Sequence, residues 1–600
     1  MNSADRTKYR DLAFFLALVF LVALMVLKAF RSVCENDESS IIFFALKYII
    51  SPRISLEERL AGIFVFPAVK LWYVFAGSTA GIVLFSRLCF VATQAAVSVF
   101  LYSQLKRYGN SAVPAALIFF FNVPSWSMML LYYHTVLVMA SGVVAALVLA
   151  VLRRCTRTRM LFLGVAVAVG VVCSPLTSLF YFVYTAAVAV CFFRSKKRAG
   201  SSSSDALMPR SWMFATLGVV LTAAAVSVYI FRGTSPWDAL SELAFLDGTN
   251  ASVGALAGLF GVKNKLAPLI EGYLPLTAGV VLPPALLALA AAIDRKRVAH
   301  GGFYVSAGAV VCVACDAVIL FYRSRFEFNR ALENVLLLYT VFAFYGLLCY
   351  IVTENKERRV FAILFCYGLL IALIRSCESK MFIFAGASVI SVCLAGAAVL
   401  SGKKAEELFA GGWRKKLLAV LTAVVVAAQL VFQVFLFSDM RYSVEKHGGL
   451  DASAEKLDTR IEAGPLKGIY STGAMAEYYA GILSDIEVIK TQTEGPVVTT
   501  NEFSWIYLAL EDRATCMDSV LFDNEWVDFE AMREYYERFP ETVPGVLYVT
   551  YLDVSSADSD FSMLSAHSAD AGQKALFDEV IKNYPGKVIN GSSGYIIDLR

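Results

Sequence analysis

Long apolar runs, separated by short basic loops, make up most of the first 438 residues. A membrane-spanning helix needs about 20 apolar residues, because backbone groups cannot be left unpaired in lipid. This rule predicts thirteen spans. They cover residues 11–31, 81–104, 111–127, 130–152, 160–176, 178–194, 211–231, 273–293, 302–322, 334–353, 359–375, 381–401 and 416–438. We therefore expect a polytopic α-helical membrane protein whose transmembrane domain is residues 1–438.

Lysine and arginine gather in alternate loops between these spans, which predicts how the chain lies in the membrane. The basic segments are 6–10, 106–107, 153–159, 194–198, 295–297, 356–359 and 403–416. We expect an integral protein of the plasma membrane. Because cytoplasmic loops carry the excess of Lys and Arg, its N-terminus is expected on the cytoplasmic side. An odd number of spans then places the C-terminal end outside the cytoplasm. The composition, 58% hydrophobic and 17% charged, excludes a soluble enzyme, a disordered chain and a nucleic-acid binder.

The segment 32–80 is expected to form one long outer loop on the membrane surface. Leu60–Ala76 is apolar enough to be a further span, but that span would send every later basic loop outward. Apolar residues between Ile41 and Ile49 recur at helical spacing, which predicts an interfacial amphipathic helix.

The last 162 residues differ in charge and pattern from the body. Residues 439–600 hold 28 acidic and 13 basic side chains, whereas residues 1–438 hold 21 acidic and 40 basic ones. Short β-rich runs alternate here with helical stretches. The β-rich runs are Gly495–Thr500, Gly545–Leu552 and Tyr595–Leu599, and the helical stretches are Ala474–Leu483, Asp528–Arg538 and Ala575–Asn583. The pattern predicts an extracytoplasmic C-terminal α/β domain at 439–600.

An acidic cluster, Glu35-Asn36-Asp37-Glu38, follows directly after the first span. Carboxylates at this depth can reach a substrate held in the membrane interface. The alternative is a solvated acidic cap, since Asp37 and Glu38 would favour the positive end of the helix that follows.

Cations on the predicted outer side break the orientation rule and so suggest a function. The set comprises Arg87, Arg323, Arg325, Arg330, Arg375 and Lys380. Guanidinium groups bind phosphate in a bidentate manner, which favours an anionic lipid headgroup or a lipid-linked phosphate. The alternative is snorkelling or ion pairing, for example of Arg87 with Asp316, an acid inside an apolar span. His134, at the outer mouth of the third and fourth spans, is either a further candidate or a hydrogen-bonded structural residue.

These pieces resemble a known family. One span, an outer loop that opens with Asp37-Glu38, an apolar segment Ile63–Lys70 that contains Pro67, and Phe75-Ala76-Gly77-Ser78 followed by Arg87-Leu88 look like the GT-C glycosyltransferases. The branch they resemble is that of the protein O-mannosyltransferases and aminoarabinose transferases. The motif likeness covers roughly residues 1–200 and includes Ser174-Pro175.

The resemblance implies an inverting transfer of a sugar from a polyprenyl-phosphate carrier to an acceptor hydroxyl of a glycan, lipid or protein outside the cytoplasm. It implies Asp37 as the base, with Glu38 either orienting it or holding a divalent cation. Some of five cationic side chains would bind the phosphate of the donor. These candidates are Lys70, Arg87, Arg323, Arg325 and Arg375. A glycan polymerase or ligase, a secondary transporter or flippase, and a non-catalytic membrane scaffold are the alternatives.

Overall fold

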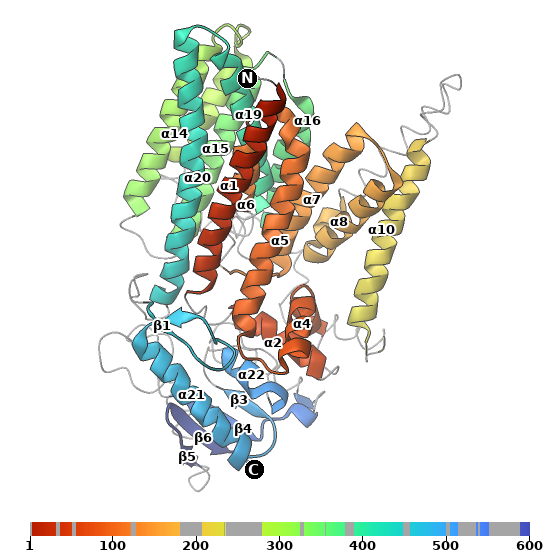
Figure 1. Ribbon diagram of the computed structural model, residues 1–600, viewed down its shortest axis with the longest axis vertical. Coiled ribbons are helices and arrows are strands. Elements are labelled where there is room, and N and C mark those ends of the chain that lie inside the picture. Colours follow the sequence, from red (N-terminus) through yellow and green to blue (C-terminus); the bar gives the residue numbers. More distant parts are fainter. Residues whose placement is uncertain are drawn as a thin grey trace.

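The structure is a computed structural model and consists of a helical bundle joined at one end to a small unit of strands and helices (Figure 1). It describes residues 3–31, 37–50, 56–121, 128–179, 207–232, 235, 279–323, 329–354, 356–378, 389–447, 457–499, 504–513, 536–537, 540–550, 582 and 588–600. We call residues 457–600, as far as they are described, the C-terminal unit. The end of the bundle that meets this unit is called the sheet end, and the opposite end the basic end.

The bundle is built from helical elements, most of which are long and apolar. They are α1 (Ser3–Ala29), α5 (Ile82–Leu105), α6 (Ala112–Phe120), α7 (Tyr133–Arg153), α8 (Arg157–Cys173), α10 (Leu207–Ile230), α14 (Gly301–Arg323), α15 (Asn329–Ile351), α16 (Arg358–Val360), the π-helical η4 (Phe361–Cys366), α17 (Tyr367–Glu378), α19 (Ser391–Phe409) and α20 (Trp413–His447). Among the described residues, seven helices are long and apolar enough to cross a membrane. Gly279–Ile293 and Val335–Ile351 are shorter apolar helices.

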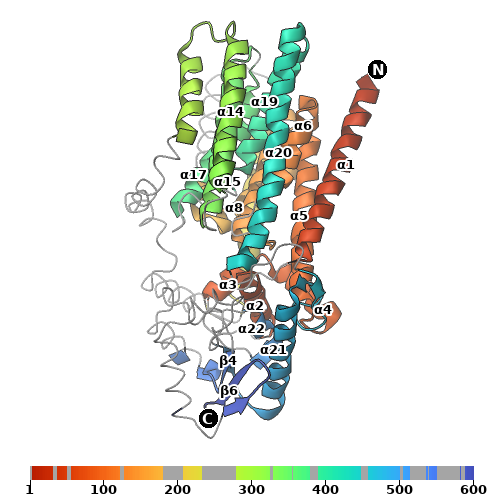
Figure 2. The same cartoon turned by 90° about the vertical axis from the view of Figure 1, so that its left-hand side faces the viewer.

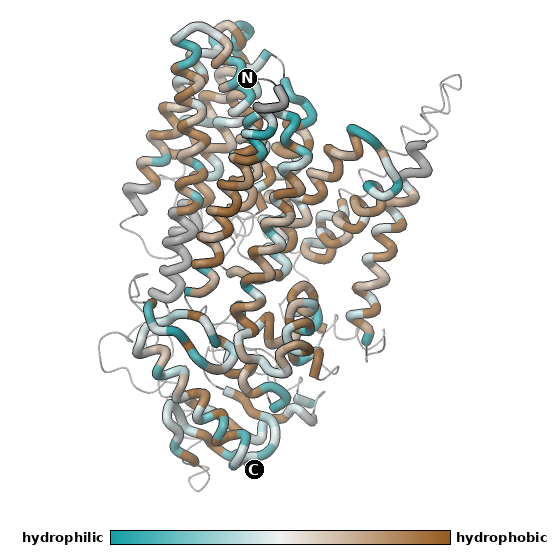
Figure 3. The backbone as a smooth tube through the Cα atoms, viewed as in Figure 1, coloured by the Kyte–Doolittle hydropathy of each residue, from teal (hydrophilic) through white to brown (hydrophobic). Residues whose placement is uncertain are grey.

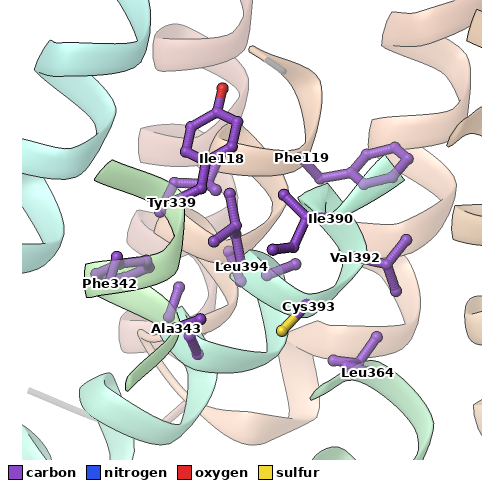
Figure 4. Packing of buried hydrophobic residues seen from close by; sticks show 14 of the residues in the cluster. Ile118, Phe119, Tyr339, Phe342, Ala343, Leu364, Ile390, Val392, Cys393 and Leu394 are labelled. Carbon is purple, nitrogen blue, oxygen red and sulfur yellow. The ribbon is translucent and has the colours of Figure 1, made fainter. Parts of the chain in front are cut away.

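The centre of the bundle is the packing of α19 against its neighbours. Residues Val389–Leu400 of this segment are almost all buried, and they meet α6, α15 and η4. Figure 4 shows Ile390, Cys393 and Leu394 among side chains of those three elements. Because α6 has only nine residues and is buried along nearly its whole length, it acts as a core helix of the bundle.

The basic segments that precede the body of α1, follow α5 and lie at the end of α19 gather at the basic end. Lys106 Nζ lies 3.4 Å from Asp11 Oδ2, and Lys404 Nζ donates to the Val352 carbonyl over 3.1 Å. Polar colouring concentrates at this end in Figure 3, whereas the middle of the bundle is apolar. The start of α1 and the C-terminal unit lie at opposite ends of the bundle (Figure 1).

Three short helices lie between the bundle and the C-terminal unit (Figure 2). They are α2 (Asp37–Ile50), α3 (Leu56–Gly62) and α4 (Phe66–Ala76). The break between α3 and α4 means that Leu60–Ala76 is not one continuous span. The prediction that the apolar stripe of α2 faces the membrane is wrong. Ile42, Ala45 and Tyr48 of this stripe are at most 1% exposed, because they are buried in the protein core. The exposed apolar face belongs instead to α4, where Val74 and Phe75 are 70% and 81% exposed.

The C-terminal unit contains a four-stranded sheet of order β3-β4-β6-β5 and two main helices. The elements are β1 (Thr459–Arg460), β2 (Tyr470–Ser471), α21 (Gly473–Gln492), β3 (Val497–Thr499), α22 (Trp505–Leu510), β4 (Val546–Thr550), β5 (Val588–Asn590) and β6 (Gly594–Asp598). β3 and β4 are parallel, while β4–β6 and β6–β5 are antiparallel. The three predicted strands correspond to β3, β4 and β6, and the first predicted helix to α21.

Other sequence expectations differ from the structure or fall outside it. α19 continues to Phe409 through the loop expected after residue 401, and α20 continues to His447 across the expected domain boundary at 439. The span at 178–194 lies almost wholly outside the described residues, as does most of the two later predicted tail helices. The count of thirteen spans, the membrane orientation and the domain division stay predictions.

Candidate functional site at the sheet end of the bundle

A buried ion pair joins α2 to α5 at the sheet end. Glu38 and Arg87 are 0% and 1% exposed, and Glu38 Oε2 lies 2.7 Å from Arg87 Nε and 2.6 Å from Nη2. Arg87 Nη1 donates to the Ala29 carbonyl at the end of α1 over 3.0 Å, and Glu38 Oε1 accepts from Met129 N–H over 2.7 Å. The pair therefore ties together α1, α2, α5 and the segment that leads into α7. The partner of Arg87 is Glu38, so Arg87 does not neutralise Asp316.

Asp37, the predicted base, is the first residue of α2 and directly precedes Glu38. Its side chain lies outside the described residues. Its backbone position is fixed by its neighbour, because Glu38 is held by charge and hydrogen bonds on both carboxylate oxygens. A carboxylate in the first turn of a helix is also favoured by the positive end of the helix dipole.

A second polar cluster lies where α7 begins and α17 ends. Arg375 and His134 are each 8% exposed. Arg375 Nε donates to His134 Nδ1 over 3.3 Å, and Arg375 Nη2 lies 3.3 Å from His134 Nε2. The guanidinium carbon also lies 5.1 Å from the centre of the Tyr133 ring. A guanidinium that contacts both an imidazole and a neighbouring aromatic ring has fewer orientations open to it than one in solvent.

An apolar groove of about 600 Å³ lies between α5, α7 and α8. Leu131 and Val136, which flank His134 in sequence, line one part of it. Leu147 and Arg159 line a part nearer the basic end, so the groove follows α7 for about three turns. Its remaining walls are almost entirely hydrocarbon, and Phe162 on its rim is 56% exposed. The shape suits a long hydrocarbon chain that enters from lipid.

The groove wall formed by α8 is held by close packing with α10. A Cβ at Gly164 would lie 1.9 Å from the Ala215 carbonyl oxygen, and one at Gly218 would lie 2.2 Å from that of Leu161. Only glycine allows the two backbones to approach this closely. The α8–α10 pair therefore forms a firm outer wall for the groove.

The other predicted phosphate-binding cations are not brought to this cluster by any described contact. Lys70 is exposed on α4, with its ammonium 5.7 Å from the centre of the Phe66 ring. The side chain of Arg323, the last residue of α14, and the whole of Arg325 lie outside the described residues. Within the described part of the chain, the cluster thus consists of Arg375, His134 and Tyr133.

No group of three or more His, Cys, Asp and Glu side chains suited to a metal ion occurs among the described residues. Glu38 fits a cation poorly, because its two oxygens are engaged by Arg87 and by Met129 N–H. Of the two roles weighed for Glu38 from sequence, its contacts favour orientation of the start of α2.

The sequence did not predict three features of this site. The Met129 N–H contact is a backbone interaction without a side-chain signal, and Tyr133 looked like one aromatic residue among many. The groove arises from three helices that are separate in sequence, so no local pattern could reveal it.

No family model and no curated protein matches the chain. Among solved structures, it is similar to ArnT from Cupriavidus metallidurans in the apo state, at 13% identity and a TM-score of 0.37, with 98% of each chain covered. It is also similar to ArnT from the same organism bound to undecaprenyl phosphate, at 12% identity and a TM-score of 0.40, again with 98% of each chain covered. These values assign no role to any residue of this chain.

Proposed function

We propose that the protein is a membrane glycosyltransferase that takes a sugar from a polyprenyl-phosphate carrier and passes it to an acceptor hydroxyl at the sheet end of the bundle. The observation that carries the proposal is that one helix, α7, both holds a buried arginine at its start and lines an apolar groove. Arg375 contacts His134 and Tyr133, and Leu131 and Val136, three residues before and two after His134, line the groove. A phosphate on a long hydrocarbon tail is a ligand that needs both features at once.

In the proposed reaction, the acceptor oxygen attacks the anomeric carbon as the bond from that carbon to the phosphate oxygen breaks. The bonding electron pair leaves with the polyprenyl phosphate, and the acceptor proton passes to Asp37. Arg375 stabilises the charge that develops on the phosphate, so the leaving group needs no proton. Glu38 and Arg87 hold the start of α2 in place and do not touch the reacting atoms.

Arg375→Ala is expected to raise the Kd for undecaprenyl phosphate about 10- to 100-fold, because a hydrogen bond to a charged group is worth about 1.5–3 kcal/mol. Arg375→Lys should recover only part of the loss, since a point charge cannot bind two phosphate oxygens in a plane. The measurement is binding of undecaprenyl phosphate to the purified protein, with Arg414→Ala as the control. Arg414 is an exposed cation at the basic end. Equal affinity of the Arg375→Ala and wild-type proteins would remove Arg375 from the phosphate site.

Ala140→Trp is expected to fill the middle of the groove, where Ala140 lies on α7 between Val136 and Val143. The variant should bind a long carrier at least about tenfold more weakly. Each CH₂ that the tryptophan displaces from the groove gives up about 0.8 kcal/mol of favourable burial free energy. A carrier of two isoprene units should bind as it does to the wild type. Competition between the two carriers for the protein tests this directly, and an equal loss for both lengths would show that the tail does not use the groove.

A further inference from the structure

Three parts of the C-terminal unit hold the elements that carry the Glu38–Arg87 pair. These elements are the end of α1, the start of α5 and the body of α2. Each receives a separate contact from a separate part of the unit. Residues more than 380 positions apart in sequence therefore determine where the pair lies.

The end of α1 is joined to β2. The Tyr470 N–H donates to the Phe30 carbonyl over 2.7 Å, and Arg31 forms a parallel bridge with Tyr470. The carbonyl of Ala29, which accepts from Arg87, belongs to the residue just before Phe30. Thus β2 holds the carbonyl that binds the arginine side chain.

The start of α5 is capped by the loop between β1 and β2. The first N–H groups of a helix have no partner within the helix. Here the Gly81 N–H donates to the Gly464 carbonyl over 3.0 Å, and the Val83 N–H donates to the Pro465 carbonyl over 3.4 Å. Gly81 and Gly464 have φ values of +77° and +68°, which only glycine adopts readily. Arg87 lies little more than one turn beyond this cap.

The body of α2 shares a hydrophobic core with the C-terminal unit. Phe43 stacks on Tyr507 of α22, with ring centres 5.1 Å apart. Ile42 and Leu46 are fully buried in the same cluster as Ile506 and Leu508. Since Phe43 is about one and a half turns from Asp37 and Glu38, the position of α22 fixes the axis on which both acids are carried.

We propose that the C-terminal unit is the positioning element of the site, and that Tyr507 and the 464–465 carbonyls are positioning groups for the transfer reaction. The unit thus holds the helices that carry the Glu38–Arg87 pair and is not an appendage that only gathers the acceptor. The predicted changes in kcat rest on the proposed function. The predicted contacts between the C-terminal unit and the bundle do not, and they are tested without any substrate.

The first test cuts the chain without removing the unit. A protease site placed between His447 and Leu457 is cleaved in the purified, folded protein. The two fragments should remain together through size-exclusion chromatography in detergent, because backbone bonds and a shared core join them. Fragments that separate under these mild conditions would overturn the proposal, whether or not the protein transfers sugar.

The second test is a double-mutant cycle on the stacked rings. Phe43→Ala and Tyr507→Ala should each lower kcat by about 10- to 100-fold with little change in donor KM, because small displacements of a reacting group are costly. The double variant should be hardly worse than either single one. Hydrogen exchange of α2 amides should rise in Tyr507→Ala, and Tyr507→Phe, which keeps the ring, should behave as wild type in kcat.

The control is Tyr548→Ala, which removes an equally buried ring from β4. The Tyr548 hydroxyl donates to Asp485 of α21 over 2.9 Å, which anchors this ring within the C-terminal unit. At a temperature where both variants are folded, Tyr548→Ala should retain the wild-type kcat and the slow exchange of α2. Equal losses of kcat in Tyr548→Ala and Tyr507→Ala would mean that the unit contributes only general stability. A failure of all variants, wild type included, to transfer sugar would count against the proposed function, and the exchange data would still decide the positioning role.

Discussion

Asp37→Asn is expected to lower the rate of sugar transfer by about 10²- to 10⁴-fold, the usual contribution of a positioned general base. Asparagine has nearly the shape of aspartate but cannot accept the acceptor's proton. Because Glu38 anchors the start of α2 through Arg87 and Met129, the helix should keep its position in the variant. The measurement is kcat with a lipid-linked sugar, together with the expression level and the thermal unfolding temperature.

The matched control for Asp37→Asn is Asp37→Glu, which keeps the base and moves it by one methylene. This variant should retain more activity than Asp37→Asn. Full activity in Asp37→Asn would remove the base assignment, and loss of expression would show that Asp37 is needed for folding instead.

Glu38→Ala is expected to destabilise the protein by about 3–5 kcal/mol, because it leaves the Arg87 guanidinium buried without its countercharge. It also removes the acceptor of the Met129 N–H, so the segment before α7 loses its tie to α2. Unfolding in increasing denaturant, followed by tryptophan fluorescence in detergent micelles, measures this loss.

A double variant, Glu38→Met with Arg87→Met, shows whether that loss comes from an uncompensated buried charge or from the absence of the pair itself. Replacing both partners of a buried pair by apolar side chains is often nearly neutral for stability, whereas removing one is not. We therefore expect the double variant to be more stable than either single variant. Additive destabilisation of the two single changes would show that the pair is not coupled in the folded protein.

The helical body could be predicted from sequence because each span is a local apolar run. The strands β3, β4 and β6 could also be predicted, since each is a short β-rich run within an acidic tail. The surface of α2 could not, because its stripe between Ile41 and Ile49 suits a membrane interface and a protein core equally well. Only the packing of α22 against Phe43 decides between these environments.

For the site, the sequence singled out the charged residues as candidates but did not predict how they pair. Glu38 and Arg87 are both charged residues near one predicted interface, and nothing in their 49-residue separation shows that they bind each other. Likewise, His134 and Arg375 lie 241 positions apart and meet only because α17 ends beside the start of α7. Long-range pairing of this kind depends on how helices pack, which local periodicity does not encode.

The proposed function depends most on a carrier phosphate bound at the sheet end of the bundle while its sugar is transferred. The most direct test is to incubate the purified protein with a panel of polyprenyl-phosphate sugars and an extract of candidate acceptors, and to measure free polyprenyl phosphate by mass spectrometry. We expect release with at least one sugar, a weaker release with Arg375→Ala, and a release about 10²- to 10⁴-fold slower with Asp37→Asn. Release that is unchanged in both variants, or movement of intact carrier across vesicles without any release, would contradict it.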